Sequence, residues 1–330
     1  MSHDSEDLRW MQATIALAAR SPALAAPNPC VGCIVVKDGV VIGRGVTANG
    51  GRPHAEAMAL EQAGESAKGA TVYVTLEPCA HKSNRGPACS DLLSAAQPER
   101  VVIALTDPDP RTAGSGTARM RAAGIAVAEG VAEEAAAYQL AGYLSQQRPN
   151  DDRGGRPHIM LKLATSLDGQ IAMADGSSQW ITGEPSRAHA HGERARYEAI
   201  LVGGETLRQD APRLDVRLPG LEERSPERIV LSRWTAPEGW AGISAPEAVY
   251  DLEAQSLMVE GGAGAAAAFL RADLVDELLL YRAPILIGDG RAALGDIGLA
   301  SLSDAHGQWR RIESRDLGND HMERYLRTRH

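Results

Sequence analysis

Aromatic side chains are scarce in this chain of 330 residues: Phe, Trp and Tyr make up 4% of it, and there is a single Phe. Proteins that hold single-stranded nucleic acid usually stack its bases on aromatic side chains. Small residues are abundant instead, including 34 glycines, and they allow helices to pack closely on a sheet. The composition therefore argues against a stacking platform for nucleic acid.

An excess of positive charge is also missing. The net charge is −9, which divides into −2 for residues 1–148 and −7 for residues 149–330. A protein that neutralises a phosphate backbone needs clustered Lys and Arg. We therefore expect no nucleic-acid partner.

Long apolar runs and many cysteines are absent as well. No stretch approaches the ~20 apolar residues of a membrane span, and the acidic start from Met1 to Asp7 lacks the pattern of a signal peptide. Four cysteines in such a chain fit reduced thiols and metal binding better than disulfides. These absences predict a cytoplasmic protein with no membrane contact. At this length two domains are expected.

The clearest chemistry lies between Pro53 and Cys89. The order His54-x-Glu56, then Pro78-Cys79, then Cys89 is typical of zinc nucleobase deaminases. One imidazole and two thiolates bind a tetrahedral Zn²⁺ and leave a fourth position for water, whose pKa the metal lowers. Glu56 is then the candidate proton shuttle. A coincidental spacing of core residues remains the alternative, because motif matches include false positives.

A second pair, Cys30 and Cys33, forms a C-x-x-C that could belong to a redox site or half a zinc knuckle. No second C-x-x-C follows, and no helix is expected to begin at Cys30. The sequence instead predicts a hairpin, with strands 33–36 and 40–42 around an Asp38-Gly39 turn. We therefore interpret Cys33 as a small core residue.

The first half shows alternating helical and strand patterns. Helices are expected at 7–20, at 55–60 with a stop at Gly64, from Pro78-Cys79 onward, and at 132–146; further strands are expected at 71–76, 100–105 and 125–128. This order predicts a three-layer α/β/α sandwich.

A polar stretch rich in Pro and Gly follows and predicts a linker at 148–157, between domains at 1–147 and 158–330. The second half is again α/β, with strands expected at 159–163, 199–202, 228–231, 257–259 and 277–281. Two strands end in glycine-rich turns, at 203–204 and at 261–264. Such a turn before a helix can bind phosphate through free N–H groups. Close packing of a helix on the sheet explains the glycines equally well.

Together, the two halves resemble the bifunctional deaminase–reductases of riboflavin biosynthesis. The resemblance rests on motifs in family order along nearly the whole chain: Pro27-Asn28-Pro29-x-Val31-Gly32-Cys33, Pro53-His54-Ala55-Glu56, Val74 to Cys79 with His81, Asp107-Pro108-x-Pro110, Lys162-x-x-x-Ser166-Leu167-Asp168-Gly169, Ser178 to Thr182, Val275 to Leu278 and Ala283-Pro284-x-Leu286-x-Gly288.

The resemblance implies a cytidine-deaminase-like first domain and a dihydrofolate-reductase-like second domain. The first would remove an amine from a diaminopyrimidinone ribosylamino phosphate. The second would reduce the ribose of the product to a ribityl chain with NADPH. The implied partners are thus a small phosphorylated pyrimidine, one Zn²⁺ per chain and NADPH, and a homo-oligomer is left open.

Site residues follow from the matching positions. In the first half, His54, Cys79 and Cys89 would bind zinc, Glu56 would move the proton, Asn28 would hold the base, and the loop from His81 to Arg85 would lie near the phosphate. Positions that match NADPH contacts are Ala164, Trp180, Thr206, Asp210, Gly262, Ala263, Gly264, Ala265, Ala266, Ala267 and Ala268. Positions that match substrate contacts are Ser178, Arg194, Leu214, Arg217 and Glu260.

The chain departs from the family pattern in three places. The loop between the zinc cysteines is one residue longer, Cys30 stands where Asn is common, and Asp109 replaces the usual Asn of Asp-Pro-x-Pro. A deaminase of another base, without a reductase, is the competing enzyme, and a zinc-stabilised binding module is the competing non-enzyme. A structural zinc site has four protein ligands and no role for Glu56.

One expectation comes from the residues alone. Strand 228–231 ends in Ser232-Arg233, and ligands of open α/β sheets lie at the carboxyl ends of strands. Arg233 could therefore bind the extra phosphate of NADPH by charge-assisted hydrogen bonds. The alternative is a solvated loop charge.

Overall fold

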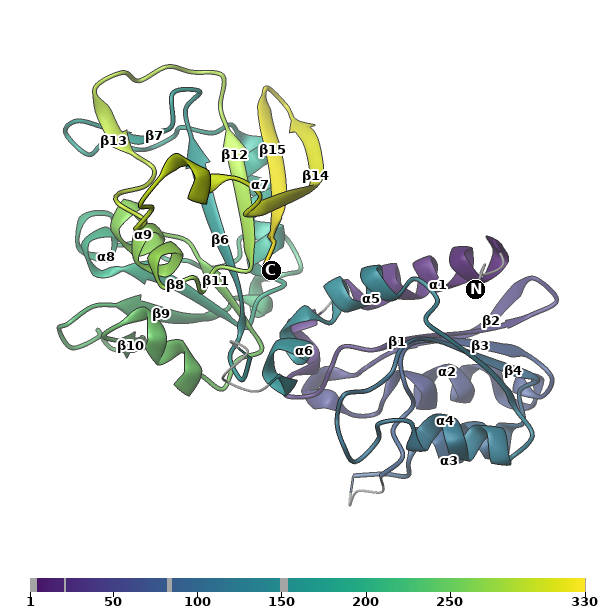
Figure 1. Ribbon diagram of the computed structural model, residues 1–330. Coiled ribbons are helices and arrows are strands. Elements are labelled where there is room, and N and C mark those ends of the chain that lie inside the picture. The colour runs from purple at the N-terminus through teal and green to yellow at the C-terminus, as the bar shows by residue number, and fades with distance from the viewer. Residues whose placement is uncertain (1–4, 21, 82–84, 149–153, 330) are drawn as a thin grey trace. The chain divides into compact units, whose positions relative to one another are not determined.

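The computed structural model describes residues 5–20, 22–81, 85–148 and 154–329. Internal contacts divide the chain into two compact units, Met1–Pro149 and Asn150–His330. Each unit is built on its own sheet (Figure 1). The residues expected to form a linker, 148–157, lie partly outside the described part of the chain.

Unit 1 contains a five-stranded sheet in the order β2-β1-β3-β4-β5. The strands are β1 (Gly32–Lys37), β2 (Val40–Val46), β3 (Thr71–Leu76), β4 (Arg100–Leu105) and β5 (Ala126–Glu129). The hairpin of β1 and β2 turns at Asp38 and Gly39, which both have positive φ, as an Asp-Gly turn requires. Strands β3, β4 and β5 pair in parallel, so their carboxyl ends share one edge.

Helices cover both faces of this sheet, which confirms the three-layer sandwich. Figure 1 shows α1 (Ser5–Ala18) and α5 (Glu133–Gln139) on one face, with α2 (Ala55–Ala63), α3 (Cys89–Ala96) and α4 (Ser115–Ala122) on the other. α2 packs closely on β2: an added Cβ at Gly45 would lie only 2.1 Å from the carbonyl oxygen of Ala55, so glycine is what allows this contact. α2 ends before Gly64, whose φ is 54°.

Two sequence expectations about helices in unit 1 are wrong. No helix begins at Pro78-Cys79: residues 77–80 have no regular structure, and α3 begins only at Cys89. Residues 78–80 are held instead by tertiary contacts, which local sequence does not reveal. The single helix expected at 132–146 is two helices, α5 and α6 (Ala141–Gln147), which meet at Leu140.

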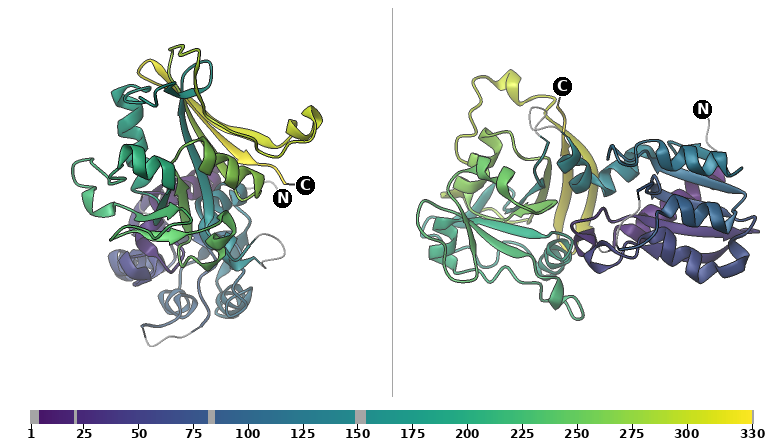
Figure 2. Two further views of the ribbon diagram at one scale, coloured as in Figure 1. Left: turned by 90° about the vertical axis from the view of Figure 1, so that its left-hand side faces the viewer. Right: turned by 90° about the horizontal axis from the view of Figure 1, so that it is seen from below.

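Unit 2 contains an eight-stranded sheet in the order β10-β9-β8-β11-β6-β12-β15-β14. The strands are β6 (His158–Thr165), β8 (Ala199–Gly203), β9 (Glu227–Leu231), β10 (Ala241–Ile243), β11 (Ser256–Val259), β12 (Glu277–Arg282), β14 (Trp309–Leu317) and β15 (Asp320–Arg327). The first six in this order are parallel, and the long hairpin β14–β15 adds an antiparallel edge, yellow in Figures 1 and 2.

Side chains of the central strands alternate between the two faces of this sheet. On β6, Ile159 and Leu161 enter one hydrophobic core with Phe269 of α9 (Ala263–Arg271), whereas Met160 enters the other core with Ala190 of α7 (Glu184–Arg194). The short helix α8 (Gly204–Asp210) follows β8 directly. A separate two-stranded sheet pairs β7 (Gln170–Met173) with β13 (Gly290–Ala292).

Buried ion pairs fix the start of unit 2. Arg156 is 2% exposed and donates two hydrogen bonds, of 2.6 and 2.8 Å, to Asp276. Asp276 also accepts the backbone N–H of Ile159 at 2.9 Å. The end of the expected linker is therefore anchored in the core of this unit.

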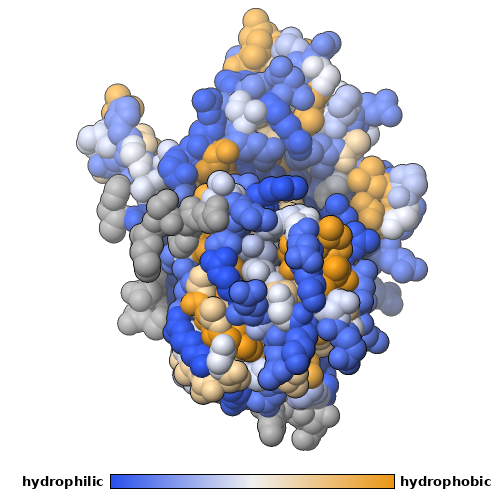
Figure 3. Space-filling view, turned by 90° about the vertical axis from the view of Figure 1, so that its right-hand side faces the viewer, coloured by the Kyte–Doolittle hydropathy of each residue, from blue (hydrophilic) through white to orange (hydrophobic). Residues whose placement is uncertain are grey.

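Surface properties agree with the composition. Hydrophilic side chains predominate on the face seen in Figure 3, and the hydrophobic ones occur there in small separate groups. In the part of the chain that the structure describes, no helix combines the length and the hydropathy that crossing a membrane would need.

Candidate functional sites

Three predicted zinc ligands meet in unit 1. Nδ1 of His54 lies 3.6 Å from Sγ of Cys79 and 3.3 Å from Sγ of Cys89, and the three ligand atoms lie within 4.8 Å of one another. Both cysteines are buried, with the half-buried His54 at the rim. A nitrogen and two sulfur donors on one side of a small space fit Zn²⁺.

The fold brings these ligands together from three segments. His54 is the N-cap residue of α2, Cys89 is the first residue of α3, and Cys79 lies just beyond β3. The backbone N–H of Cys89 donates to Sγ of Cys79 over 3.3 Å, as a free N–H at a helix start can. The contact between the two thiols lowers the pKa of Cys79, which accepts, and raises the pKa of Cys89, which donates.

Glu56 lies in the first turn of α2 and is 3% exposed. Burial raises its pKa to about 6, although His54 nearby lowers it. A carboxyl group with such a pKa can both accept and donate a proton near neutral pH. This fits the shuttle role that the sequence predicts.

Cys30 and Cys33 do not join this cluster in the described part of the chain. Cys30 is buried, donates from Sγ to the carbonyl oxygen of Ala18, and has a pKa raised to about 12 by burial. Cys33 lies in the hydrophobic core. Both therefore stay protonated, in agreement with the core interpretation.

Asn28 lies beside the metal ligands. Its Nδ2 is 3.2 Å from Nε2 of His54 and 2.9 Å from the carbonyl oxygen of Gly51. Arg85 donates to the carbonyl oxygen of Gly50 at 2.7 Å, and His81 contacts Thr112 at 3.4 Å. Residues 82–84 of the same loop lie outside the described residues.

A buried carboxylate supports the segment that carries Cys79. Glu77 is 3% exposed and accepts the backbone N–H groups of Gly114, Thr117 and Asp107 over 2.9 to 3.3 Å. Gly116 allows this close approach, because an added Cβ there would lie 2.1 Å from the carbonyl oxygen of Pro78. The Glu-Pro-Cys motif thus contains a structural anchor next to the ligand.

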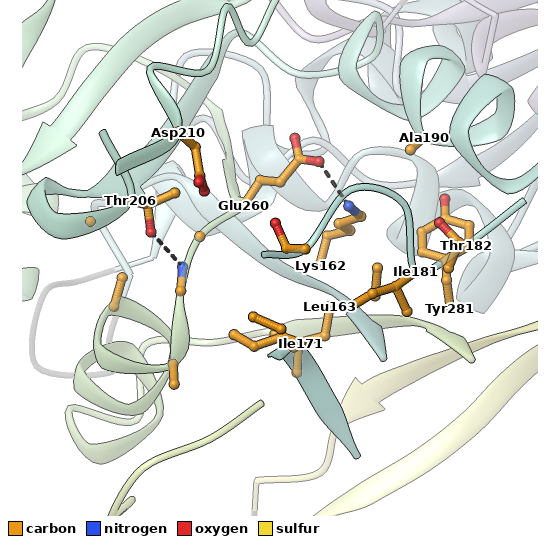
Figure 4. Close-up of a pocket in the computed structure, with 18 of the residues that line it drawn as sticks. Lys162, Leu163, Ile171, Ile181, Thr182, Ala190, Thr206, Asp210, Glu260 and Tyr281 are labelled. Carbon is orange, nitrogen blue, oxygen red and sulfur yellow. Dashed lines mark hydrogen bonds and ion pairs between the residues drawn. The ribbon is translucent and has the colours of Figure 1, made fainter. Parts of the chain in front are cut away.

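Unit 2 holds a cavity of about 420 Å³ (Figure 4). Its lining includes twelve of the residues expected to contact cofactor or substrate: Ala164, Ser178, Trp180, Arg194, Thr206, Asp210, Arg217, Glu260, Gly262, Ala263, Gly264 and Ala265. These residues come from distant parts of the sequence and meet at the carboxyl ends of parallel strands, where ligands of open α/β sheets bind.

Five expected residues do not line this cavity. Leu214 and Ala266 lie in hydrophobic cores, Ala267 is buried, and Ala268 lies further along α9. Arg233 is exposed just beyond β9. Its role in cofactor selection remains a prediction.

A carboxylate held by two cations lines the cavity. Glu260 accepts from Nζ of Lys162 at 2.8 Å and from Nε and Nη2 of Arg194 at 2.8 and 3.0 Å. Burial alone would raise the pKa of Glu260, but Lys162 and Arg194 outweigh it and hold the pKa well below its usual range. Figure 4 shows the Lys162–Glu260 contact, and Leu163, Ile171 and Ile181 line the same cavity.

A helix start lies beside this group. Gly262 is the N-cap residue of α9, and its N–H donates to Oγ1 of Thr206 at 3.0 Å (Figure 4). The free N–H groups of the first turn, at Ala263 to Ala265, line the cavity and suit phosphate oxygens. An added Cβ at Gly262 would lie 2.9 Å from Oγ1 of Thr206, so glycine permits this contact.

Sequence reasoning missed several lining residues. Lys162 opens the Lys162-x-x-x-Ser166 motif, and the signal in the sequence for a functional side chain is a lysine inside an apolar strand. Nζ of Lys162 lies over the ring of Tyr281 on β12, 5.7 Å from the centroid of that ring. His191 and Arg291 also line the cavity, and nothing in their local sequence distinguishes them from surface residues.

The comparisons with known proteins agree with this geometry. Residues 4–105 match the model of the cytidine and deoxycytidylate deaminase zinc-binding region, and residues 157–239 and 240–322 match the RibD C-terminal domain. The riboflavin biosynthesis protein RibD of Escherichia coli is 38% identical over 96% of this chain and 98% of its own. That of Aquifex aeolicus is 36% identical over 95% and 96%.

Solved structures show the same arrangement. RibD of Acinetobacter baumannii superposes with a TM-score of 0.85 at 35% identity, over 98% of this chain and 99% of that one. A structure described as a diaminohydroxyphosphoribosylaminopyrimidine deaminase/5-amino-6-(5-phosphoribosylamino)uracil reductase, from Thermotoga maritima, superposes with a TM-score of 0.84 at 29% identity over the same shares. The sequence, the two sites and the fold thus agree that the chain belongs to the RibD family of bifunctional riboflavin-biosynthesis deaminase–reductases.

Proposed function

We propose that unit 1 deaminates 2,5-diamino-6-ribosylamino-4(3H)-pyrimidinone 5′-phosphate. We further propose that unit 2 reduces the ribosyl chain of the product with NADPH to give 5-amino-6-ribitylamino-uracil 5′-phosphate. The observation that carries this proposal is the presence, on one chain, of the His54–Cys79–Cys89 cluster beside Glu56 and of a cavity lined by the first turn of α9. The domains are proposed at 1–147 and 158–330, with a linker at 148–157.

In unit 1, His54, Cys79 and Cys89 would hold one zinc ion per chain, which supplies a bound water of lowered pKa. Glu56 would take the proton of that water and later give it to the departing amine, as its pKa of about 6 permits. Asn28 would orient the base beside His54. His81 and Arg85 would lie near the phosphate.

In unit 2, the N–H groups at the start of α9 would bind cofactor phosphates. Ala164, Trp180, Thr206 and Asp210 would contact the rest of NADPH. Ser178 and Glu260 would contact the substrate, and Arg194 and Arg217 would also contact it and suit its phosphate, since a guanidinium group forms paired hydrogen bonds to phosphate.

The test is incubation with the diaminopyrimidine phosphate, with and without NADPH, followed by mass analysis. Without NADPH we expect only the exchange of an amine for oxygen. With NADPH we expect the further gain of two hydrogens. Failure to form the deaminated product, or reduction without NADPH, would contradict the proposal.

Zinc content is tested separately. Purified protein is expected to hold one zinc per chain, and Cys79→Ser or Cys89→Ser is expected to lose most of it. Cys30→Ser is the matched control, because Cys30 is a buried cysteine outside the cluster. Full deaminase activity in a wild-type sample free of zinc would disprove the metal assignment.

A further inference from the structure

His191 of α7 lies among the cations that line the cavity of unit 2. Its Nε2 is 3.3 Å from Nη2 of Arg217. Its Nδ1 is 3.1 Å from the carbonyl oxygen of Asp215 and 3.3 Å from the backbone nitrogen of Arg217. The ring therefore contacts Arg217 through both of its nitrogens.

The donors around the ring decide what it can do. A guanidinium group has only N–H donors, so Nε2 must accept from Arg217, which leaves the proton on Nδ1 to be donated to Asp215. In the other neutral tautomer, Nδ1 would accept the backbone N–H of Arg217 instead. Only the tautomer with its proton on Nδ1 accepts from the guanidinium group of Arg217, and the protonated ring has no acceptor left.

Burial and two neighbouring arginines favour the neutral ring. Arg194 lies one turn along α7, with Nη1 3.5 Å from Nδ1 of His191, and Arg217 approaches from the segment after α8. Burial, then Arg194 and Arg217, lower the pKa of His191, while the Asp215 carbonyl and Glu260 act in the opposite direction. His191 is therefore neutral at pH 7 and able to accept.

Arg217 has little else to hold it. Its side chain is 51% exposed, and its contact with Asp215 is 3.5 Å long. By contrast, the side chain of Arg194 is 13% exposed and forms two hydrogen bonds with Glu260. For Arg217, the contact with the imidazole of His191, at 3.3 Å, is shorter than the contact with the Asp215 carboxylate.

We propose that His191 is a positioning residue, which accepts a hydrogen bond from Arg217 and holds its guanidinium group at the cavity, ready for the substrate phosphate. The proposal rests on the proposed function, because that function assigns the phosphate to Arg217. The contact itself can be tested without substrate.

The first test measures the pKa of His191 by NMR in the whole, substrate-free protein, with the signal assigned by its loss in His191→Gln. Arg217→Ala is expected to raise this pKa toward the usual value of about 6.5, because a neighbouring cation disappears. An unchanged pKa would show that the two side chains do not interact and would overturn the proposal.

The second test measures reduction of the deaminated phosphate substrate. His191→Ala is expected to raise its KM by roughly tenfold, with kcat and the KM for NADPH nearly unchanged. His191→Gln should restore the low KM, because its amide oxygen also accepts from Arg217. The exposed His306→Gln is the control. Equal falls in kcat for His191→Ala and His191→Gln would indicate a general structural role and overturn the proposal.

The third test uses pH. Between about pH 7.5 and 5.5, the KM of the wild type is expected to rise relative to that of His191→Gln, because only the wild type loses its acceptor on protonation. The titration of the substrate phosphate is common to both and cancels in the ratio. A fall in the KM of the wild type relative to that of His191→Gln would mean that the imidazolium itself attracts the phosphate, which overturns the positioning role.

An unaltered KM in Arg217→Ala would disprove the phosphate assignment of Arg217, while the NMR shift would still report the contact.

Discussion

Two carboxylates of unit 2 that are largely enclosed are each matched by two cations. Glu260 lies between Lys162 and Arg194, and Asp276 accepts from Arg156 and Arg329. Removing the carboxylate of such a group leaves its cations without a partner of opposite charge, which costs about 3–5 kcal/mol where the charge is buried. The cost of substituting a charged residue therefore depends on its position and partners as well as on its type.

Glu198, just before β8, is held differently. Oε2 of Glu198 accepts the backbone N–H of Gln255 at 3.1 Å, and burial raises its pKa to about 7. Because the folded state binds this proton more tightly than the unfolded state does, protonation of Glu198 contributes to the free energy of unfolding. This contribution is complete below the unfolded pKa, near 4.5, and is lost as pH rises toward 7.

Glu198→Gln is therefore expected to stabilise the protein at alkaline pH. The amide keeps the hydrogen bond from Gln255 and removes the buried charge, so the free energy of unfolding should rise by about 1 kcal/mol at pH 8 and hardly change at pH 4. Urea unfolding at both pH values measures this. The exposed Glu227→Gln is the control and should show no such difference; an equal gain at both pH values would contradict the explanation.

At the scale of elements, close helix–sheet contact positions the deaminase residues. The start of α2 carries His54 and Glu56, and the residue between them, Ala55, lies against Gly45 of β2. No side chain fits between helix and strand at this point. The glycines of β2 therefore serve the site although they are not part of it.

Gly45→Ala tests this contact. The added methyl group would push α2 away from β2, and overpacking of this kind costs about 1–3 kcal/mol. We expect lower stability and weaker zinc retention, measured by unfolding and by competition with a chelator. Val40→Ala, at an exposed position of the same strand, should change neither. Normal zinc retention in a destabilised Gly45→Ala would show that α2 does not align the ligand.

The segment just after β9 carries the residue expected to distinguish NADPH from NADH. Arg233 is exposed there and lies outside the lining of the cavity, while Ser232 packs near Gly204 at the start of α8. If Arg233 binds the extra phosphate, Arg233→Ala should lower kcat/KM for NADPH by about tenfold, or about 1.4 kcal/mol. The value for NADH should hardly move. Equal effects on both cofactors would leave Arg233 a surface charge.

At the scale of the whole molecule, the two activities belong to two units with separate cores. Glu56→Gln is expected to keep zinc but to lose deamination by at least ~100-fold, the usual scale of general acid–base catalysis. Reduction of already deaminated substrate should persist, as a spectroscopic assay of NADPH oxidation would show. A parallel loss of both activities would contradict two independent sites.

Motif order and local pattern predicted a large part of this architecture. The zinc ligands were recognisable because a metal requires particular donor atoms, and donor identity is written in the sequence. The hairpin at Asp38-Gly39, the end of α2 at Gly64 and the central strands were also expected, because these elements depend on local backbone preferences and hydrophobic periodicity.

Other features were decided only by the tertiary structure. The residues after Cys79 are not helical because the Glu77 carboxylate and the close approach of Gly116 hold that segment. Leu214 and Ala266 lie in hydrophobic cores and Lys162 lines the cavity, because the packing of strands and helices decides which face of each element is enclosed. His191 gains its partners from a segment 26 residues away. Sequence alone thus determined which chemical groups the protein has, whereas long-range packing decided which of them meet.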